Sequence, residues 1–155
     1  MKKVIFLFIL CVFLLPISYS QGFLKVGDKA FLKIDKLLQC PSPKTYIQSI
    51  DELKGKVVIL EFWATWCGPC VANFPHLNKL KNTFKDSPLE IISISSENES
   101  TINKFLSKTK LDTWVGIDKD GLMFKKYNAF SIPQTVLIDK NGNIAAMTNP
   151  WSVTD

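Results

Sequence analysis

The chain of 155 residues contains no arginine, and all 19 of its basic residues are lysines. Proteins that recognise phosphates or base edges favour the guanidinium group, whose planar fork bonds two acceptors at once. The formal net charge of +5 is scattered along the chain, and two of the positive charges are Lys2 and Lys3 at its start. The composition therefore argues against a nucleic-acid-binding protein, and the lysines are interpreted as ordinary solvation of the surface.

Metal ligands are also scarce, because the chain has one histidine and four cysteines. The spacing of Cys67 and Cys70 suits half of a zinc site, but a tetrahedral site needs four ligands. The further candidates are Cys40 and His76, and His76 belongs to the same predicted helix as the cysteine pair. We therefore predict no metal and no other cofactor, and we interpret Cys40 as a free thiol in a loop.

No apolar run reaches the length of about 20 residues that a membrane-spanning helix needs. The longest run, at 4–15, follows two lysines and ends at Pro16, and small residues stand before the end of the segment at Ser20. This order is typical of a secretory signal peptide. We predict a signal peptide over 1–20 and one domain over 21–155, located outside the cytoplasm. An uncleaved anchor that holds the domain on the extracytoplasmic side is the alternative.

The segment Trp66-Cys67-Gly68-Pro69-Cys70 lies between an apolar run at 57–63 and a predicted helix at 67–84. The first turn of a helix leaves backbone N–H groups unpaired, and these groups favour a thiolate on Cys67. Cys70 follows one turn later, where it can resolve a mixed disulfide formed by Cys67. A purely structural disulfide is the weaker interpretation, because it would close too short a loop to stabilise the fold much. The pattern predicts a redox site.

Hydrophobic periodicity and turn residues predict a mixed α/β order. Ser100 is the predicted N-cap of the middle helix. An Asn-Gly pair predicts a type I′ turn in a closing hairpin. The predicted elements are an edge strand at 31–34, a helical turn at 49–53, strands at 57–63, 89–95, 114–117, 136–138 and 144–147, and helices at 67–84, 101–110 and 122–127.

Glu61 is unusual because it interrupts the most apolar predicted strand. A carboxylate in such a strand is costly unless it is paired or used in chemistry. One interpretation places it at an exposed edge or in a pair with Lys56. The other places it beneath the cysteines, where desolvation raises its pKa and it relays a proton to or from Cys70. We favour the second interpretation.

The end of the sequence resembles the start of another helix. Ser152 and Asp155 have the spacing of a capping box, with aspartate in the place of the usual glutamate or glutamine. We therefore expect the sequence to stop short of a final helix, which leaves one face of the sheet less covered.

The chain resembles the thioredoxin fold, a central mixed β-sheet flanked by helices. More closely, it is similar to the exported TlpA/ResA-like thiol–disulfide oxidoreductases. The resemblance covers about 22–146 and depends on the motifs Phe62–Cys70 and Ser131–Asp139. Some exported relatives carry a glutamate shortly after the second cysteine, where this chain has Asn73. The acidic residue therefore follows the thioredoxin pattern, whereas the insertion at 97–111 follows the exported branch.

The resemblance implies roles for individual residues. Cys67 is the nucleophile, Cys70 the resolving thiol and Glu61 the buried acid. Pro133 is a cis-proline that turns the Ile132 backbone toward the cysteines, where it can pair with an extended substrate. The other implied substrate-binding residues are Trp66, Gly68 and Pro69.

The sequence thus predicts an extracytoplasmic thiol–disulfide oxidoreductase that mainly reduces disulfides in protein substrates. A membrane thiol–disulfide donor is the expected second partner, because a dithiol outside the cytoplasm needs a source of electrons. One alternative is a peroxiredoxin-like thiol peroxidase, but its peroxidatic cysteine is expected to have a partnering arginine, which this chain lacks. The other alternative is a non-catalytic binding domain with the same fold.

Overall fold

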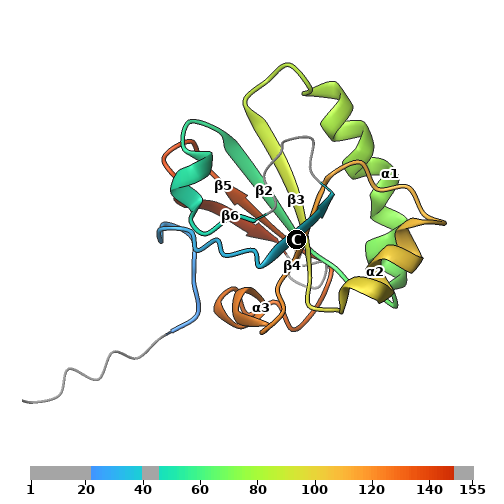
Figure 1. Cartoon of the computed structure of the whole chain (residues 1–155). Coiled ribbons are helices and arrows are strands. Elements are labelled where there is room, and N and C mark those ends of the chain that lie inside the picture. The colour runs from blue at the N-terminus through green and yellow to red at the C-terminus, as the bar shows by residue number, and fades with distance from the viewer. Residues whose placement is uncertain (1–21, 40–45, 149–155) are drawn as a thin grey trace, which may run out of the picture.

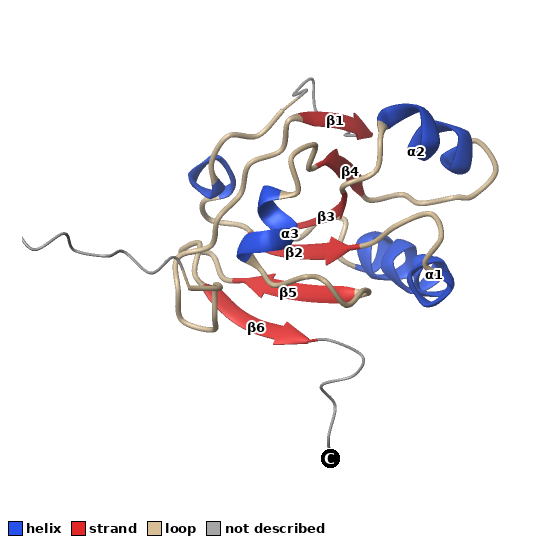
Figure 2. Cartoon of the chain, turned by 90° about the horizontal axis from the view of Figure 1, so that it is seen from below, coloured by secondary structure: helices blue, strands red, loops and turns tan. Residues whose placement is uncertain are grey.

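A computed structural model describes residues 22–39 and 46–148 (Figure 1). The predicted signal peptide, Cys40 and the predicted final capping box lie outside these residues. Within them, one mixed sheet has the strand order β1-β4-β3-β2-β5-β6 (Figure 2). Its strands are β1 (Lys36–Gln39), β2 (Val57–Phe62), β3 (Leu89–Ser95), β4 (Trp114–Ile117), β5 (Gln134–Ile138) and β6 (Ile144–Thr148).

The strand β2 lies inside the sheet, as its apolar sequence predicts. It pairs in parallel with β3 and antiparallel with β5. The strand β4 pairs in parallel with β3, and β1 and β6 form the antiparallel edges. The observed sheet confirms the predicted thioredoxin-like α/β class.

Helices cover both faces of this sheet. The helices α1 (Gly68–Thr83) and α2 (Glu99–Leu106) contribute Phe74, Leu77 and Ile102 to the cluster on one face. The helix α3 (Leu122–Lys126) and the 3-10 turn η1 (Ile50–Leu53) contribute to the other cluster. The cysteines therefore lie on the α1 side of the sheet.

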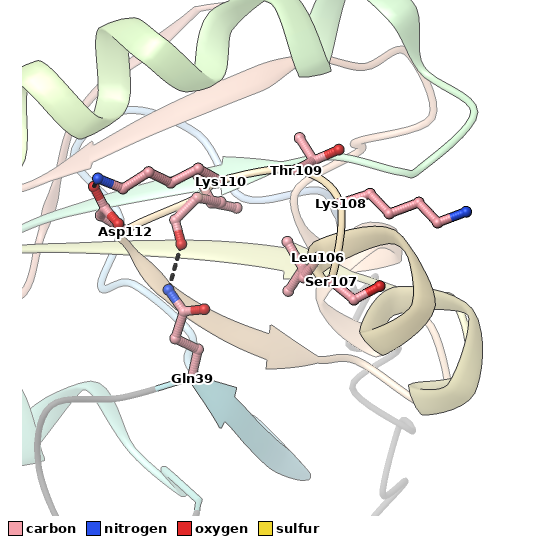
Figure 3. Close-up of a pocket in the computed structure, with 8 residues that line it drawn as sticks. Gln39, Leu106, Ser107, Lys108, Thr109, Lys110 and Asp112 are labelled. Carbon is pink, nitrogen blue, oxygen red and sulfur yellow. Dashed lines mark hydrogen bonds and ion pairs between the residues drawn. The ribbon is translucent and has the colours of Figure 1, made fainter.

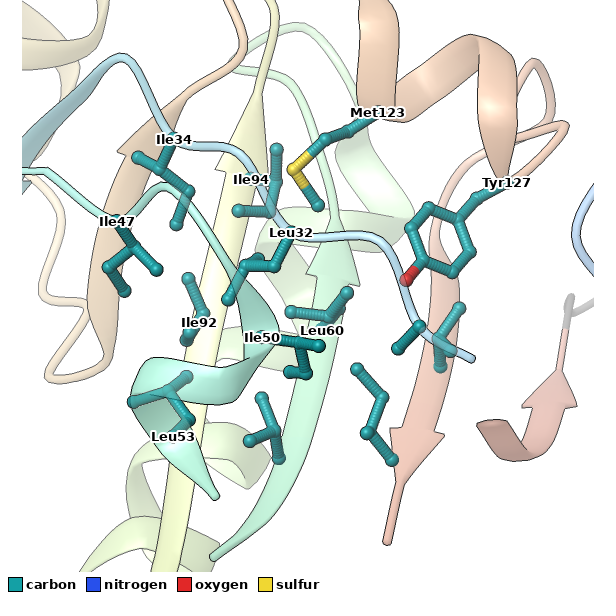
Figure 4. Close-up of a cluster of buried hydrophobic side chains, with 14 of the residues drawn as sticks. Leu32, Ile34, Ile47, Ile50, Leu53, Leu60, Ile92, Ile94, Met123 and Tyr127 are labelled. Carbon is teal, nitrogen blue, oxygen red and sulfur yellow. The ribbon is translucent and has the colours of Figure 1, made fainter. Parts of the chain in front are cut away.

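The larger of the two hydrophobic clusters lies on the α3 side of the sheet and holds the elements there together (Figure 4). Residues from the N-terminal segment, η1, the central strands and α3 meet there, and all are nearly inaccessible to solvent. Gly116 on β4 allows close packing, because a Cβ there would lie 2.9 Å from the Cγ2 of Ile34. Larger side chains on either partner would overpack this contact.

The edge strand predicted at 31–34 is wrong in position. Ile34 makes an isolated bridge with Ile47, and the strand on this side is β1. The backbone N–H and C=O of Phe31 instead bond the hydroxyl of Tyr127, at 3.0 and 2.8 Å. The apolar residues at 31–34 indicate that this segment is buried against the core. They do not distinguish a strand from an ordered loop, because either can bury such residues.

Two other local predictions are corrected. The helix α2 begins at Glu99 after Asn98, whose Oδ1 accepts the N–H of Thr101 at 2.9 Å, so Ser100 is not the N-cap. The β5–β6 turn is also different from the predicted type I′. That turn needs positive φ at two central residues, but Gly142 has a φ of 84° and Asn141 is not in that region.

No helix in the described ranges has the length and apolar character needed to cross a bilayer.

Candidate active site

Cys67 and Cys70 form a disulfide at the start of α1. Their sulfur atoms are 2.01 Å apart and their Cα atoms are 5.3 Å apart. Cys67 is the N-cap of the helix, and its Sγ accepts the backbone N–H of Cys70 at 3.3 Å. Both side chains are buried. The predicted redox pair is thus closed, and the sulfur of Cys67 lies at the helix end that favours a thiolate.

The loop between β2 and α1 is held by aromatic packing and backbone bonds. The N–H of Trp63 donates to the carbonyl of Ile94, which extends the ladder one residue beyond β2. The buried Trp63 ring meets Phe74 of α1 edge to face, with centroids 5.1 Å apart. In contrast, Trp66 directly before the disulfide is 74% exposed. Trp63 therefore packs in the core beneath the loop, whereas Trp66 faces solvent directly before Cys67.

Glu61 lies inside the sheet on the α1 side and is 1% exposed. The hydroxyl of Thr135 donates to its Oε2 at 2.5 Å, and the side-chain amide of Asn73 donates to its Oε1 at 3.2 Å. Desolvation by burial raises the pKa of the Glu61 carboxyl, and these two hydrogen bonds only partly oppose it. The proposed pair with Lys56 is not formed, because Lys56 contacts Glu90 at 2.5 Å.

Asn73 connects this acid to the helix that carries the cysteines. It lies three residues after Cys70 on α1, so the two side chains share one helix face. Its side-chain amide donates to the buried acid, so the helix that carries the cysteines contacts Glu61 directly. Sequence reasoning noted this position without foreseeing the contact.

The peptide bond between Ile132 and Pro133 is cis, as the resemblance implies. It lies directly before β5, the strand that carries Thr135 beside Glu61. The side chain of Ile132 packs against the cluster that contains both cysteines. The connection before β5 is thus brought to the cysteine pair by the pairing of β5 with β2.

Glu97 is a residue that sequence reasoning missed. Its Oε2 accepts the backbone N–H of Thr65 at 2.6 Å, and its Oε1 accepts the Thr65 hydroxyl at 2.8 Å. It also accepts the hydroxyl of Ser95 at 3.4 Å. These bonds fix the loop two residues before Cys67. No local pattern marks Glu97, because the contact spans 32 positions of the chain.

Phe130 also escaped prediction. It is 73% exposed in the connection that leads to cis-Pro133. It stands three residues before cis-Pro133 in the chain. The only signal in the sequence was a bulky aromatic residue between the predicted helix at 122–127 and the predicted strand at 136–138.

Other residues and hollows considered as functional sites in the described part of the chain show no arrangement suited to catalysis. His76 is exposed on α1. The hollow in Figure 3 lies between the end of β1 and the segment after α2, where the amide of Gln39 donates to the carbonyls of Leu111 and Thr113. These bonds tie the two segments together. Among residues 22–39 and 46–148, no three His, Cys, Asp or Glu side chains gather as a metal site.

Comparison with known proteins agrees with this geometry. The model of the AhpC/TSA family matches residues 36–147. A thiol–disulfide oxidoreductase ResA from Bacillus cereus is 33% identical over 150 residues, which cover 92% of this chain and 83% of that protein. The chain belongs to the AhpC/TSA family, within its ResA-like thiol–disulfide oxidoreductases.

Two further comparisons concern the length of the match and the fold. A ResA from Bacillus thuringiensis subsp. konkukian is 36% identical over 96 residues, and the match spans 61% of this chain but only 56% of that relative. The solved thioredoxin domain of a thiol–disulfide oxidoreductase from Bacteroides vulgatus has a TM-score of 0.68 and 26% identity, covering 80% of this chain and 88% of that one. The second likeness confirms the thioredoxin fold of this ResA-like chain.

Proposed function

We propose that this ResA-like protein reduces disulfides of protein substrates outside the cytoplasm. The observation that carries the proposal is the Cys67–Cys70 disulfide at the N-terminus of α1, the helix whose Asn73 contacts the buried acid Glu61. This is the oxidised state that such a reductant reaches at the end of one turnover. The positive end of the helix favours the thiolate that starts the next one.

The reaction begins when the Cys67 thiolate attacks one sulfur of the substrate disulfide. A Cys67–substrate bond forms, the substrate S–S bond breaks, and the released substrate thiolate takes up a proton. Cys70 then loses its proton to the Glu61 carboxylate and attacks Cys67. The mixed disulfide breaks and the Cys67–Cys70 bond is restored. The second substrate sulfur leaves as a thiolate and takes up a proton. The substrate has gained two electrons and two protons.

The raised pKa of Glu61 suits this work. A base with an ordinary carboxyl pKa would be too weak to take a proton from a thiol near neutral pH. Asn73 and Thr135 hold the two carboxylate oxygens in place. Trp66, Gly68 and Pro69 are exposed beside the disulfide and would contact the substrate, together with Ile132 and Pro133.

Another protein must reduce the disulfide again, because thiol pools that keep cysteines reduced in the cytosol are missing outside it. A membrane thiol–disulfide donor fulfils this requirement. The predicted signal segment at 1–20 and the family resemblance support the extracytoplasmic site.

A thiol peroxidase remains the competing enzyme. The closed Cys67–Cys70 pair supports the disulfide reductase, because each thiol has a built-in partner for exchange. The absence of arginine also counts against the peroxidase.

The test is reduction of a protein disulfide such as that of insulin by the reduced protein. The wild type should reduce it, Cys67→Ser should be inactive, and Cys70→Ser should accumulate a mixed disulfide that gel electrophoresis detects. Turnover of hydrogen peroxide with no reduction of insulin would favour the peroxidase, and neither activity would favour the binding domain.

A further inference from the structure

A groove runs from the cysteine loop to α2. Its lining comes from the loop that ends at Cys67 and from α2 together with the turn after it. The loop contributes Thr65 and Trp66, and the helix side contributes Thr101, Lys104, Phe105 and Lys108.

The groove is continuous with the redox site. Trp66 forms part of its wall and precedes Cys67 by one residue. The bonds between Glu97 and Thr65 hold this wall in a fixed position. A segment joined to Cys67 through a mixed disulfide can therefore extend along the groove without a change in the loop.

The charge of the groove is positive. Lys104 lies on α2 and Lys108 lies in the turn that follows it, and both line the groove and are exposed. In the described part of the chain neither side chain forms an ion pair, and no acidic residue lines the groove.

The acidic residues nearest to these lysines in sequence already have partners. Asp112 forms an ion pair with Lys110, at 3.3 Å. Glu97 binds Thr65 and Ser95. Glu99 forms an ion pair with Lys36, at 2.7 Å. The charge of the two groove lysines is thus left for a partner.

We infer that this groove binds an acidic segment of the protein substrate whose disulfide is reduced. The inference extends the proposed function and names the substrate class. Asp or Glu residues of the segment lie over Lys104 and Lys108, and an apolar side chain lies between Trp66 and Phe105. Because the lysines are exposed, their contribution is greatest in the rate of encounter and falls with ionic strength.

The test uses three synthetic peptides that each carry one cysteine as a mixed disulfide with thionitrobenzoate. They differ at two positions near the cysteine, which hold two Glu, two Gln or two Lys. The reduced protein cleaves the mixed disulfide, and the released thionitrobenzoate is followed by absorbance. At low salt the Glu peptide should react about three- to tenfold faster than the Gln peptide, the range that two exposed charge pairs provide. The preference should collapse at about 0.5 M salt.

The variant with Lys104→Gln and Lys108→Gln should lose the preference for the Glu peptide. The control with Lys79→Gln and Lys85→Gln removes the same charge from α1 and the loop after it, and it should keep the preference. Equal rates for the three wild-type peptides, a faster Lys peptide or an equal loss in the control would each overturn the inference. If the wild type reduces no peptide at all, the proposed function fails instead.

Discussion

At the scale of single residues, Glu61 is the side chain to which the proposed mechanism assigns the proton transfer. It is buried in the middle of a sheet without a cationic partner among the described residues, and it accepts hydrogen bonds from a neutral amide and a hydroxyl. The sequence marked Glu61 as a candidate, because it interrupts an apolar strand, but it left a pair with Lys56 open. Its partners Asn73 and Thr135 could not be predicted, because they come from separate elements that only the fold brings together.

Replacing Glu61 by Gln should slow the step in which Cys70 resolves the mixed disulfide. The expected loss at pH 7 is on the order of 100-fold, typical of a lost proton acceptor. Stopped-flow kinetics across pH should show that the wild-type rate rises through the raised pKa of Glu61 and that the variant lacks this rise. Glu90→Gln, which removes a carboxylate on the neighbouring strand, is the control. An unchanged pH profile in Glu61→Gln would contradict the assigned role.

The same carboxyl should also couple stability to pH. Its folded pKa is raised, so the folded protein binds the proton more tightly than the unfolded chain. The stabilisation from this proton is fully present below the unfolded value of about 4.3 and is lost as the pH rises through the folded pKa. Urea unfolding of the oxidised protein at several pH values should therefore show wild-type stability falling relative to Glu61→Gln over that window. A difference that does not vary with pH would refute the coupling.

Glu97 should act as a positioning residue for the cysteine loop. Glu97→Ala leaves the N–H of Thr65 without its acceptor, and the reaction of reduced Cys67 with a small disulfide should slow by up to about tenfold. Glu97→Gln keeps one acceptor oxygen and should restore most of the rate. Equal losses in both variants would point to the charge of Glu97 instead of its hydrogen bonds.

At the scale of elements, sequence patterns located the strands and helices better than their ends. The strand β3 was predicted with its observed bounds, because its leucine and isoleucines are followed directly by a polar segment at 96–100. The start of α2 was missed by two residues, because Asn98 and Ser100 are both good caps and both precede the apolar face. In the folded chain Ser100 donates to the Oδ1 of Asn98 at 2.7 Å and so supports the true cap.

This assignment is testable by two alanine variants. Asn98→Ala should lower the free energy of unfolding by about 1 kcal/mol, because the N–H of Thr101 loses its acceptor. Ser100→Ala should cost clearly less, since the bond between Thr101 and Asn98 stays. Chemical denaturation of both variants checks the order, and a larger loss in Ser100→Ala would restore the original prediction.

At the scale of the whole molecule, the fold brings three distant parts of the chain to one site. The cysteine pair begins α1, the buried acid lies in β2, and the cis-proline precedes β5. The fold was predictable because the motif at 62–70 and the motif at 131–139 together resemble those of the thioredoxin fold. The groove along α2 could not be predicted from the sequence, because its two walls come from separate elements and no periodicity relates them.

The most direct test of the account is the redox equilibrium of the Cys67–Cys70 pair. The protein starting at Gln21 would be equilibrated with dithiothreitol or glutathione buffers and followed by the fluorescence of Trp63 and Trp66. A two-electron transition near about −270 mV, the thioredoxin value, is the result expected of a reductant. A transition near about −120 mV, the value of a strong oxidant, would reverse the direction of electron flow and contradict the account.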